Sequence, residues 1–329
     1  MNYVLGIDGG GSKTLCILMD AECQVLGRGA AGASNYQSIG VAAAIQSIHS
    51  AIQTAASEAL KFTNTIQISA ICLGLAGVGR SGDIEIVKSM VQELQNSQFL
   101  PITWDVQPAN IVVCHDALIA LVGGVGHDVG IVVAAGTGSI VFGRNHQGET
   151  KRVGGWGYIL GDEGSAYKIA VAGMQAALKS YDGREISTSL VPNFQQHLGL
   201  QNIAELIEVI YRRGWGVKEI ASLAPIVDLA AASGDELANN IINNAVKELV
   251  TSTSTVINAM FIPNSVVEIV TTGSVWRGKS QIHEKFTTAI VNHFPQVKVM
   301  FPRYEPAYGA GLLALQSLSI SHEKFNSAI

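Results

Sequence analysis

Residues 1–20, MNYVLGIDGGGSKTLCILMD, decide the fold of this chain. The apolar runs from Tyr3 to Ile7 and from Leu15 to Met19 are typical of buried strands, and a glycine-rich loop joins them. A turn between two strands needs only one or two glycines. Three consecutive glycines therefore indicate that a ligand approaches the backbone closely.

The loop between these strands has the composition of a phosphate site. Its N–H groups and polar side chains can surround a phosphate tail, and they come from Gly10, Gly11, Ser12, Lys13 and Thr14. Asp8, at the end of the first strand, is the residue type that holds a magnesium ion, usually through water. The loop is not a P-loop, because Ser12 stands where that motif needs a glycine before the lysine. An ordinary glycine-rich hairpin is the alternative.

Length and composition exclude several classes of protein. A chain of 329 residues with 48% hydrophobic and 14% charged residues is typical of a compact enzyme with two domains. A net charge of −5 without a Lys/Arg cluster argues against a nucleic-acid partner. Neither a leader sequence nor an apolar run of about 18 residues is present, and the four scattered cysteines resemble free thiols. We therefore expect a cytoplasmic protein.

The predicted elements occur twice in a similar order. Three strands, a helix, a strand, a helix and a strand lead to Asp116, and a strand from Val129 to Ala135 starts the order again. The second half is rich in helices, among them one from Glu236 to about Met260. No Pro- or Ser-rich linker separates the halves, so we expect a hinge after Asp116. The repetition predicts a duplicated fold with a cleft between two domains.

Two later turns resemble the loop after Asp8. The turn Thr137-Gly138-Ser139 joins two apolar strands and can approach a phosphate from the side opposite to the first loop. Gly273 follows another apolar strand and exposes its backbone, so a flat base could lie beside Ser274. Each turn alone could be a plain loop. Three glycine turns after apolar strands favour a nucleotide site.

Asp116 is the candidate catalytic carboxylate. It follows an apolar strand at the expected hinge, where a partly desolvated carboxylate could take a proton from a hydroxyl that attacks phosphorus. The structural alternative is that Asp116 caps the helix that begins after it.

Residues 154–166, GGWGYILGDEGSA, form the densest polar stretch. Trp156 offers a flat face to a sugar ring, and Asp162 and Glu163 can accept hydrogen bonds from sugar hydroxyls. Alternatively, Asp162 caps the following helix and Glu163 favours its positive end. Ser34 and Asn35 are further candidate sugar contacts.

Four motifs resemble those of a known family: GIDGGGSKT at 6–14, AGTGS at 135–139, GGWGYILGDEGSAY at 154–167 and GSVW at 273–276. Together they look like N-acetylglucosamine kinases of the BadF/BadG/BcrA/BcrD ATPase family. The resemblance covers nearly the whole chain and implies an α/β, duplicated actin-like (ribonuclease H-like) ATPase fold, with two mixed five-stranded sheets around an ATP/sugar cleft. The implied domains are 1–117 and 118–304, and the C-terminal helix 305–320 would pack back on the first domain.

The resemblance also implies a role for each motif residue in an ATP-dependent kinase. Asp8 would lie at the site of Mg²⁺ and the phosphates, and Asp116 would activate the sugar 6-hydroxyl. The remaining phosphate and adenosine contacts would come from the first loop and from Thr137, Gly138, Ser139, Gly273 and Ser274. The sugar pocket would be lined by Asn35, Asp116, Trp156, Gly157 and Asp162.

One difference from the family's motifs leaves the identity of the sugar substrate undecided. The mammalian enzymes have an Asn directly after the Gly-Thr-Gly-Ser loop, and this chain has Ile140. N-acetylglucosamine, glucosamine and N-acetylmuramate therefore all remain candidate substrates. The expected partners are an amino sugar and ATP, without nucleic acid or membrane, and a homodimer is compatible with the sequence.

The family also contains activator ATPases that bridge an iron–sulfur cluster, and a sugar sensor without catalysis is a further alternative. Cysteines inside strands argue against the first, and intact Asp8, Asp116 and Thr137 argue against the second.

Overall fold

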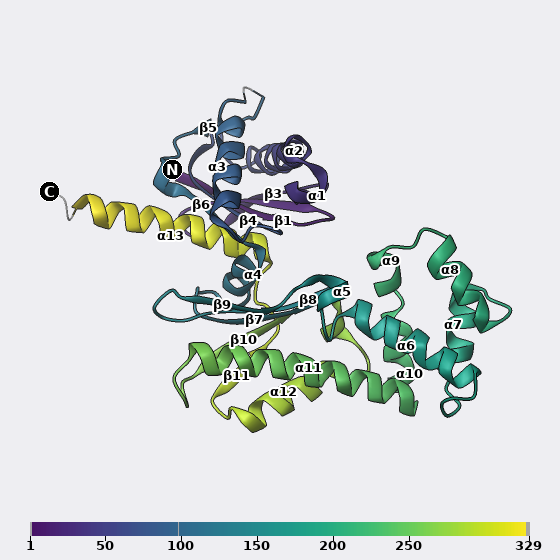
Figure 1. Ribbon diagram of the computed structural model, residues 1–329. Helices are drawn as coiled ribbons and strands as arrows, with labels where there is room; N and C mark the ends of the chain where they lie inside the picture. The colour runs from purple at the N-terminus through teal and green to yellow at the C-terminus, as the bar shows by residue number, and fades with distance from the viewer. Residues whose placement is uncertain (1, 98, 327–329) are drawn as a thin grey trace. The chain divides into compact units, whose positions relative to one another are not determined.

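The computed structural model describes residues 2–97 and 99–326 and divides into two compact units. The first unit runs to Asp128 and resumes at Pro302, and the second is Val129–Phe301 (Figure 1). The boundary therefore lies after the helix that follows Asp116, whereas the sequence suggested residue 117. The reason is that this helix, α4 (Asp116–Val125), packs against α13 (Pro306–Asn326) within the first unit.

The first unit contains a mixed sheet in the order β3-β2-β1-β4-β5, with β6 also paired to β4. The strands are β1 Asn2–Gly9, β2 Thr14–Met19, β3 Val25–Ala31, β4 Gln67–Leu75, β5 Thr103–Trp104 and β6 Ile111–His115. Strands β1, β2 and β3 form an antiparallel meander, while β4 is parallel to β1, β5 and β6. The sheet thus has six strands rather than the expected five, because the two-residue β5 is too short to produce a periodic pattern.

Helices cover both faces of this sheet. Side chains alternate along β1, so that Leu5 and Ile7 pack under α2 (Val41–Ala59) and α3 (Ser81–Gln95). Val4 on the opposite face packs against α4 and α13. Figure 1 shows α2 and α3 on one side of the strands and α13 on the other. The short helices of this unit are α1 Tyr36–Ile39 and η1 Pro108–Asn110.

Glycines bring the C-terminal helix α13 into backbone contact with the sheet. A Cβ on Gly6 of β1 would lie 2.3 Å from the carbonyl oxygen of Ala307, and one on Gly309 would lie 2.1 Å from that of Ile119 in α4. No side chain fits at either position. The start of α13 is therefore fixed directly against β1 and α4.

The second unit repeats the strand arrangement of the first. Its sheet has the order β11-β10-β7-β8-β9, with an antiparallel meander β7-β8-β9 and β10 parallel to β7 and β11. The strands are β7 Gly130–Ala135, β8 Ser139–Arg144, β9 Thr150–Gly154, β10 Val267–Thr272 and β11 Val297–Met300. In both sheets the first strand lies between its meander and a parallel strand. This shared order is the structural form of the duplication.

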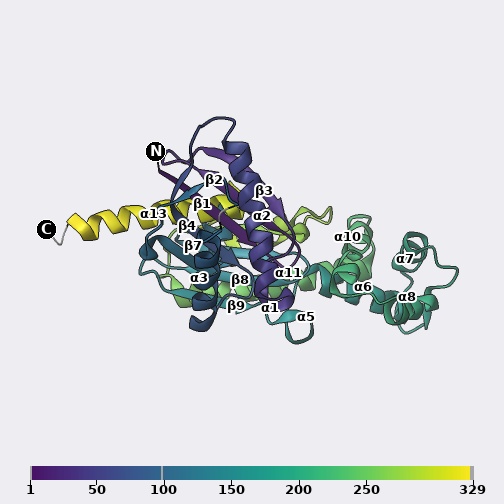
Figure 2. The same ribbon diagram turned by 90° about the horizontal axis from the view of Figure 1, so that it is seen from above.

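The helices of the second unit, apart from α5, pack into a large apolar cluster with one face of the sheet. They are α5 Gly157–Leu160, α6 Ala166–Tyr181, α7 Leu190–Leu198, η2 Ile203–Glu205, α8 Leu206–Arg212, α9 Val217–Ala221, α10 Ala224–Ala232, α11 Glu236–Met260, η3 Ser274–Arg277 and α12 Ile282–His293. The long helix α11 has the bounds that the sequence predicted. Figure 2, like Figure 1, shows α7 and α8 far from the strands of this unit. In the described part of the chain, no helix has both the length and the apolarity to cross a membrane.

Candidate functional site

Backbone hydrogen bonds at Gly10 fix the conformation of the first glycine loop. The Gly10 N–H donates to the carbonyl oxygen of Lys13 (3.0 Å), and the N–H groups of Ser34 and Asn35 donate to that of Gly10 (3.0 and 3.2 Å). A Cβ on Gly9 would lie 2.3 Å from Ser34 Oγ, so a larger residue there would displace the Ser34 side chain. At Gly11 the space is open, which leaves room for a ligand against the backbone.

The side chains of this loop divide into exposed and buried groups. Ser12 and Lys13 are exposed beside Gly11, as a phosphate site requires. Thr14 is fully buried, and its Oγ1 donates to the carbonyl oxygen of Gly32 (2.7 Å) and lies 2.7 Å from Ser34 Oγ. The Thr14 hydroxyl therefore fastens the base of the loop, and Ser34 belongs to the same bond network.

Three carboxylates of the first unit act on one another electrostatically. The pKa of Asp8 is raised to about 6, mainly by burial; the negative charges of Asp116 and Glu305 add to this shift, and the positive charge of Lys13 opposes it. The desolvated carboxyl group is thus Asp8 rather than Asp116, whose side chain is 38% exposed. Sequence reasoning missed Glu305, because only the return of α13 brings it near Asp8.

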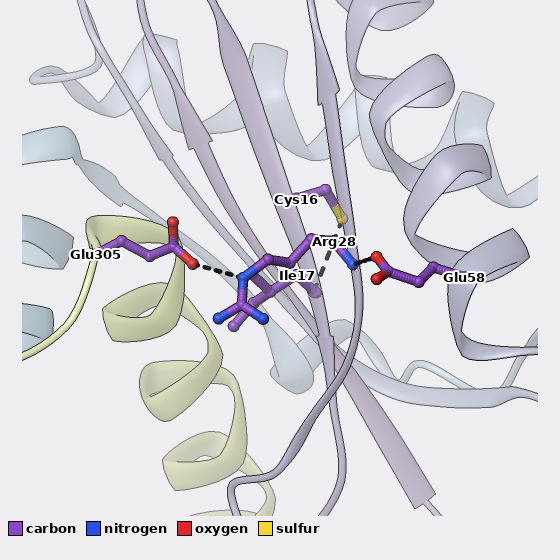
Figure 3. Close-up of polar contacts among 5 residues, drawn as sticks. All are labelled: Cys16, Ile17, Arg28, Glu58 and Glu305. Carbon is purple, nitrogen blue, oxygen red and sulfur yellow. Dashed lines mark hydrogen bonds and ion pairs between the residues drawn. The ribbon is translucent and has the colours of Figure 1, made fainter. Parts of the chain in front are cut away.

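The positive charge of Arg28 partly neutralises the carboxylate of Glu305. Its Nε donates to Glu305 Oε1 at 3.1 Å, and its backbone N–H donates to Glu58 Oε2 at 2.6 Å (Figure 3). Both side chains of the ion pair are substantially exposed, so the pair contributes well under about 1 kcal/mol to stability. Its effect is to position the Glu305 carboxylate at the start of α13.

Asp116 is the first residue of α4, and the N-cap is His115. His115 Nδ1 accepts a hydrogen bond from the N–H of Ala117 (3.1 Å) and lies 2.7 Å from Asp116 Oδ1. The first contact needs an unprotonated Nδ1 and the second a protonated one, so the two are alternatives. The expectation that Asp116 might cap this helix is wrong. Its carboxylate instead belongs to the first turn of α4.

The donor set at Asp8 fits Mg²⁺ as bound with a nucleotide. Among the described residues, no three His, Cys, Asp or Glu side chains are grouped closely enough to hold a metal by themselves. Mg²⁺ commonly uses only one or two carboxylates and takes its other ligands from waters and substrate phosphates. A divalent cation at Asp8 would offset the repulsion that raises the pKa of this carboxyl group.

Asn35 lies between β3 and α1 in the first unit. It is the N-cap of α1, where its Oδ1 accepts from the N–H of Gln37 at 3.1 Å. Gln37 Nε2 in turn donates to the carbonyl oxygen of Gly77 (2.7 Å). The capping bond uses only the side-chain oxygen of Asn35. A Cβ on Gly77 would lie 3.1 Å from that oxygen, so the Gly77 backbone packs closely against Asn35.

In the second unit, Asp162 connects the turn at 136–139 with the GGWG stretch. Its carboxylate accepts hydrogen bonds from the N–H groups of Gly157 and Ser139, and its pKa is raised mainly by burial. Ser139 Oγ donates to the carbonyl oxygen of Glu163 at 2.7 Å. A Cβ on Gly138 would lie 2.7 Å from Asp162 Oδ2. Asp162 does not cap α6, because Ser165 is the N-cap and accepts from the N–H of Lys168 (3.3 Å).

Gly273 brings the third turn against the second. Its φ is 110°, and a Cβ there would lie 2.2 Å from the carbonyl oxygen of Ala135 and 2.9 Å from the backbone N of Gly136. Trp276 is buried behind this contact and donates from Nε1 to the carbonyl oxygen of Val133 at 3.1 Å. The structure therefore brings the turns at 136–139 and 273–274 together, as a nucleotide site requires.

A cavity of about 540 Å³ opens beside Ser274. Its walls include Ala221 and Pro225 on one side and Gly278 and Lys279 on another. Most of its lining is apolar, which suits a flat heteroaromatic base. The size and position fit an adenosine group that borders Gly273 and Ser274.

Trp156 differs from Trp276 in being exposed, with 66% of its surface accessible. The guanidinium of Arg152 lies 4.5 Å from the ring centroid, which leaves the other ring face for a ligand. Gly157 follows with a φ of 86° and open space around it. Exposed aromatic faces of this kind suit the apolar face of a sugar ring.

Two sheets with one strand order, each with a glycine turn after its first strand, define an ATPase of the actin-like fold class. The chain belongs to the BadF/BadG/BcrA/BcrD ATPase family, whose sequence profile matches residues 5–314.

Named relatives agree with this assignment. The N-acetylmuramic acid/N-acetylglucosamine kinase of Clostridium acetobutylicum is 36% identical over 95% of this chain and 98% of its own. The N-acetyl-D-glucosamine kinase of Dictyostelium discoideum is 32% identical over the same shares of the two chains. A solved structure from Chromobacterium violaceum, presented as a candidate N-acetylglucosamine kinase, superposes with a TM-score of 0.71 at 24% identity and covers 95% of this chain and 98% of its own. The chain is an enzyme of the kinase class.

Proposed function

We propose that this protein is an amino-sugar kinase that transfers the γ-phosphate of Mg-ATP to the 6-hydroxyl of N-acetylglucosamine or a close relative. The observation that carries the proposal is the placement of Asp8 and Asp116 close enough to influence each other, beside an open glycine loop in the first unit. The relatives of known name act on N-acetylglucosamine, N-acetylmuramic acid or glucosamine, which supports an amino sugar as the substrate.

In this mechanism the backbone of the glycine loops binds the nucleotide. In the first unit the exposed backbone at Gly11 and the open side of Gly10, with Ser12 and Lys13, contact the phosphates. In the second unit the phosphate contacts are Thr137 and its neighbours in the turn. The adenosine occupies the cavity beside Ser274. Bound Mg²⁺ at Asp8 would supply neutralisation of the phosphate charge.

Asp116 acts as the general base in the proposal. Its side chain is 38% exposed in the first turn of α4, so its carboxylate is accessible to the sugar 6-hydroxyl whose proton it would accept. Asp8 is not assigned the role of the base because its carboxylate would hold the metal. The candidate sugar contacts are Asn35 in the first unit and, in the second unit, Trp156, Gly157 and Asp162.

An assay of ADP release tests this function. With Mg-ATP, we expect turnover with N-acetylglucosamine, glucosamine or N-acetylmuramate well above the rate without sugar. Asp116→Asn should lower kcat by about 10²- to 10⁴-fold, the range that a positioned general base supplies, and leave ATP affinity nearly unchanged. Sugar-independent ATP hydrolysis, or loss of ATP binding in the variant, would contradict the proposal.

Two of the four cysteines argue against the activator-ATPase alternative. Cys16 and Cys72 are fully buried within strands, where they cannot reach a cluster shared between two chains.

A further inference from the structure

The second unit contains a cavity of about 420 Å³ to which the proposed function assigns no ligand. Its walls come from α5, α6, α8 and α9 and from the loop between the last two helices. Buried side chains of the unit's apolar cluster form its floor, among them Met174, Leu206 and Ile220. Ile207 and Tyr211 of α8 line it with 56% and 81% of their surfaces exposed. The cavity therefore has an apolar floor and an accessible rim.

Four aromatic side chains line this cavity: Tyr158, Tyr167, Tyr211 and Trp215. The rings of Tyr158 and Tyr167 meet edge to face, with centroids 5.2 Å apart and an interplanar angle of 64°, which is a favourable aromatic geometry. The described lining residues carry no charge, and Gln175 is the one amide side chain among them. A lining of this kind suits a neutral apolar group and disfavours a phosphate or a carboxylate, whose charge would be left unpaired.

The cavity is continuous with the stretch that the proposed function assigns to the sugar. Tyr158 directly follows Gly157, and Tyr167 lies in the first turn of α6, shortly after Asp162. Consecutive Cα atoms are about 3.8 Å apart, so the wall of the cavity begins one residue beyond a proposed sugar contact. A group attached directly to the sugar can therefore reach the cavity without a long linker.

The helix α5 adds further apolar surface beside the cavity. None of its residues is buried, and Ile159 and Leu160 are 73% and 79% exposed. Large apolar side chains that are exposed together are typical of binding surfaces. The volume also permits an aromatic ligand, because an apolar cavity of about 150 Å³ is enough to hold benzene.

We infer that this cavity is an extension of the acceptor site, and that it binds a neutral apolar group, aryl or short alkyl, attached to the amino sugar. The substrate class then includes amino sugars with an apolar substituent at the anomeric oxygen or on the nitrogen. The inference rests on the proposed function. It assigns to Tyr158 and Tyr211 the role of selecting the substituent, while phosphoryl transfer stays with the residues described above.

The test uses two pairs of acceptors that differ only in an apolar group and keep the 6-hydroxyl free. One pair is the phenyl and methyl β-glycosides of N-acetylglucosamine, and the other is N-benzoylglucosamine and N-acetylglucosamine. In at least one pair, the wild type should favour the aromatic member by about 10- to 100-fold in kcat/KM, mainly through a lower KM. This is the range that burial of a phenyl-sized group supplies, and the responding pair identifies the attachment point.

Tyr211→Ala removes an aromatic wall at a residue exposed enough that the fold should remain intact. It should lower kcat/KM for the preferred aromatic acceptor by about 3- to 10-fold and leave its methyl or acetyl counterpart unchanged. Tyr211→Phe keeps the ring and should retain the preference. The matched control is Phe62→Ala, which removes an aromatic side chain that is 73% exposed in the first unit, and it should leave both pairs unchanged.

Absence of a preference in both pairs, or a preference that Tyr211→Ala leaves unchanged, would overturn the inference. Stimulation of methyl-glycoside turnover by free phenol would also overturn it, because the cavity would then be a separate effector site. A changed molecular mass of Tyr211→Ala in solution would instead assign this surface to a contact between copies of the chain. If the methyl and N-acetyl acceptors are phosphorylated without any preference, only this inference fails; if no acceptor is phosphorylated, the proposed function fails as well.

Discussion

Replacing Asp8 by Asn should make the ligand-free protein more stable at neutral pH. The folded state raises the pKa of Asp8 from its ordinary 3.8 to about 6, because the carboxyl group is desolvated and lies near Asp116 and Glu305. At about 1.4 kcal/mol per pH unit, keeping Asp8 ionised in the folded protein costs about 3 kcal/mol. Asn keeps the shape of the side chain and removes this cost.

The pH dependence gives the prediction its sign. Since the folded state binds the Asp8 proton more tightly than the unfolded state, the stabilisation from this group is fully present below about pH 4 and is lost as the pH rises through about 6. Asp8→Asn should therefore exceed the wild type by up to about 3 kcal/mol at pH 8 and match it at pH 4.

Urea denaturation followed by circular dichroism at both pH values measures the difference. Glu93→Gln removes an exposed charge in the same unit and should change stability by less than about 0.5 kcal/mol at either pH. Mg-ATP should stabilise the wild type more than Asp8→Asn, because only the wild type retains the carboxylate for the metal. An Asp8→Asn protein that is no more stable at pH 8, or whose advantage persists at pH 4, would refute the electrostatic argument.

Two further predictions concern the second unit, each tested by a variant and its control. Gly273→Ala should destabilise the protein by about 1 to 3 kcal/mol and raise the KM for ATP, because the φ of 110° and the carbonyl oxygen of Ala135 leave no place for a Cβ. Gly183→Ala, at a φ of 77° in open space, controls for the backbone conformation alone, and an equal effect of both would exclude the contact as the cause. Ser165→Ala removes the cap of α6 and should lower stability in urea by about 1 kcal/mol, while Ser165→Gly should lower it by only a few tenths. Identical losses in the two variants would contradict the capping role.

Local patterns in the sequence predicted the strand–turn–strand units well. The loop after Asp8, the turn at 136–139 and the long helix α11 depend on residues close together in the chain, where glycines and apolar periodicity determine the backbone. The same patterns identified the order of elements that the duplicated sheets confirm.

What the sequence missed depends on contacts between distant residues. Asp116 was expected to be the desolvated carboxylate because its neighbours in the chain are apolar, yet Asp8 has the raised pKa. Burial is set by tertiary packing, and the charge of Glu305 reaches Asp8 only through α13. The caps were missed for a similar reason: His115 and Ser165 occupy positions one and three residues away from the expected aspartates, a shift that only the backbone geometry reveals.

The packing of α13 against β1 has a consequence for the folding of the protein during translation. The first unit needs Ala307 against Gly6 and Gly309 against Ile119, so one face of its β-sheet is covered only by α4 until α13 has been synthesised. Val129–Phe301 is a continuous segment that can fold while translation proceeds. The nascent chain should therefore complete its second unit first, and the early strands would need protection from aggregation until the last helix emerges.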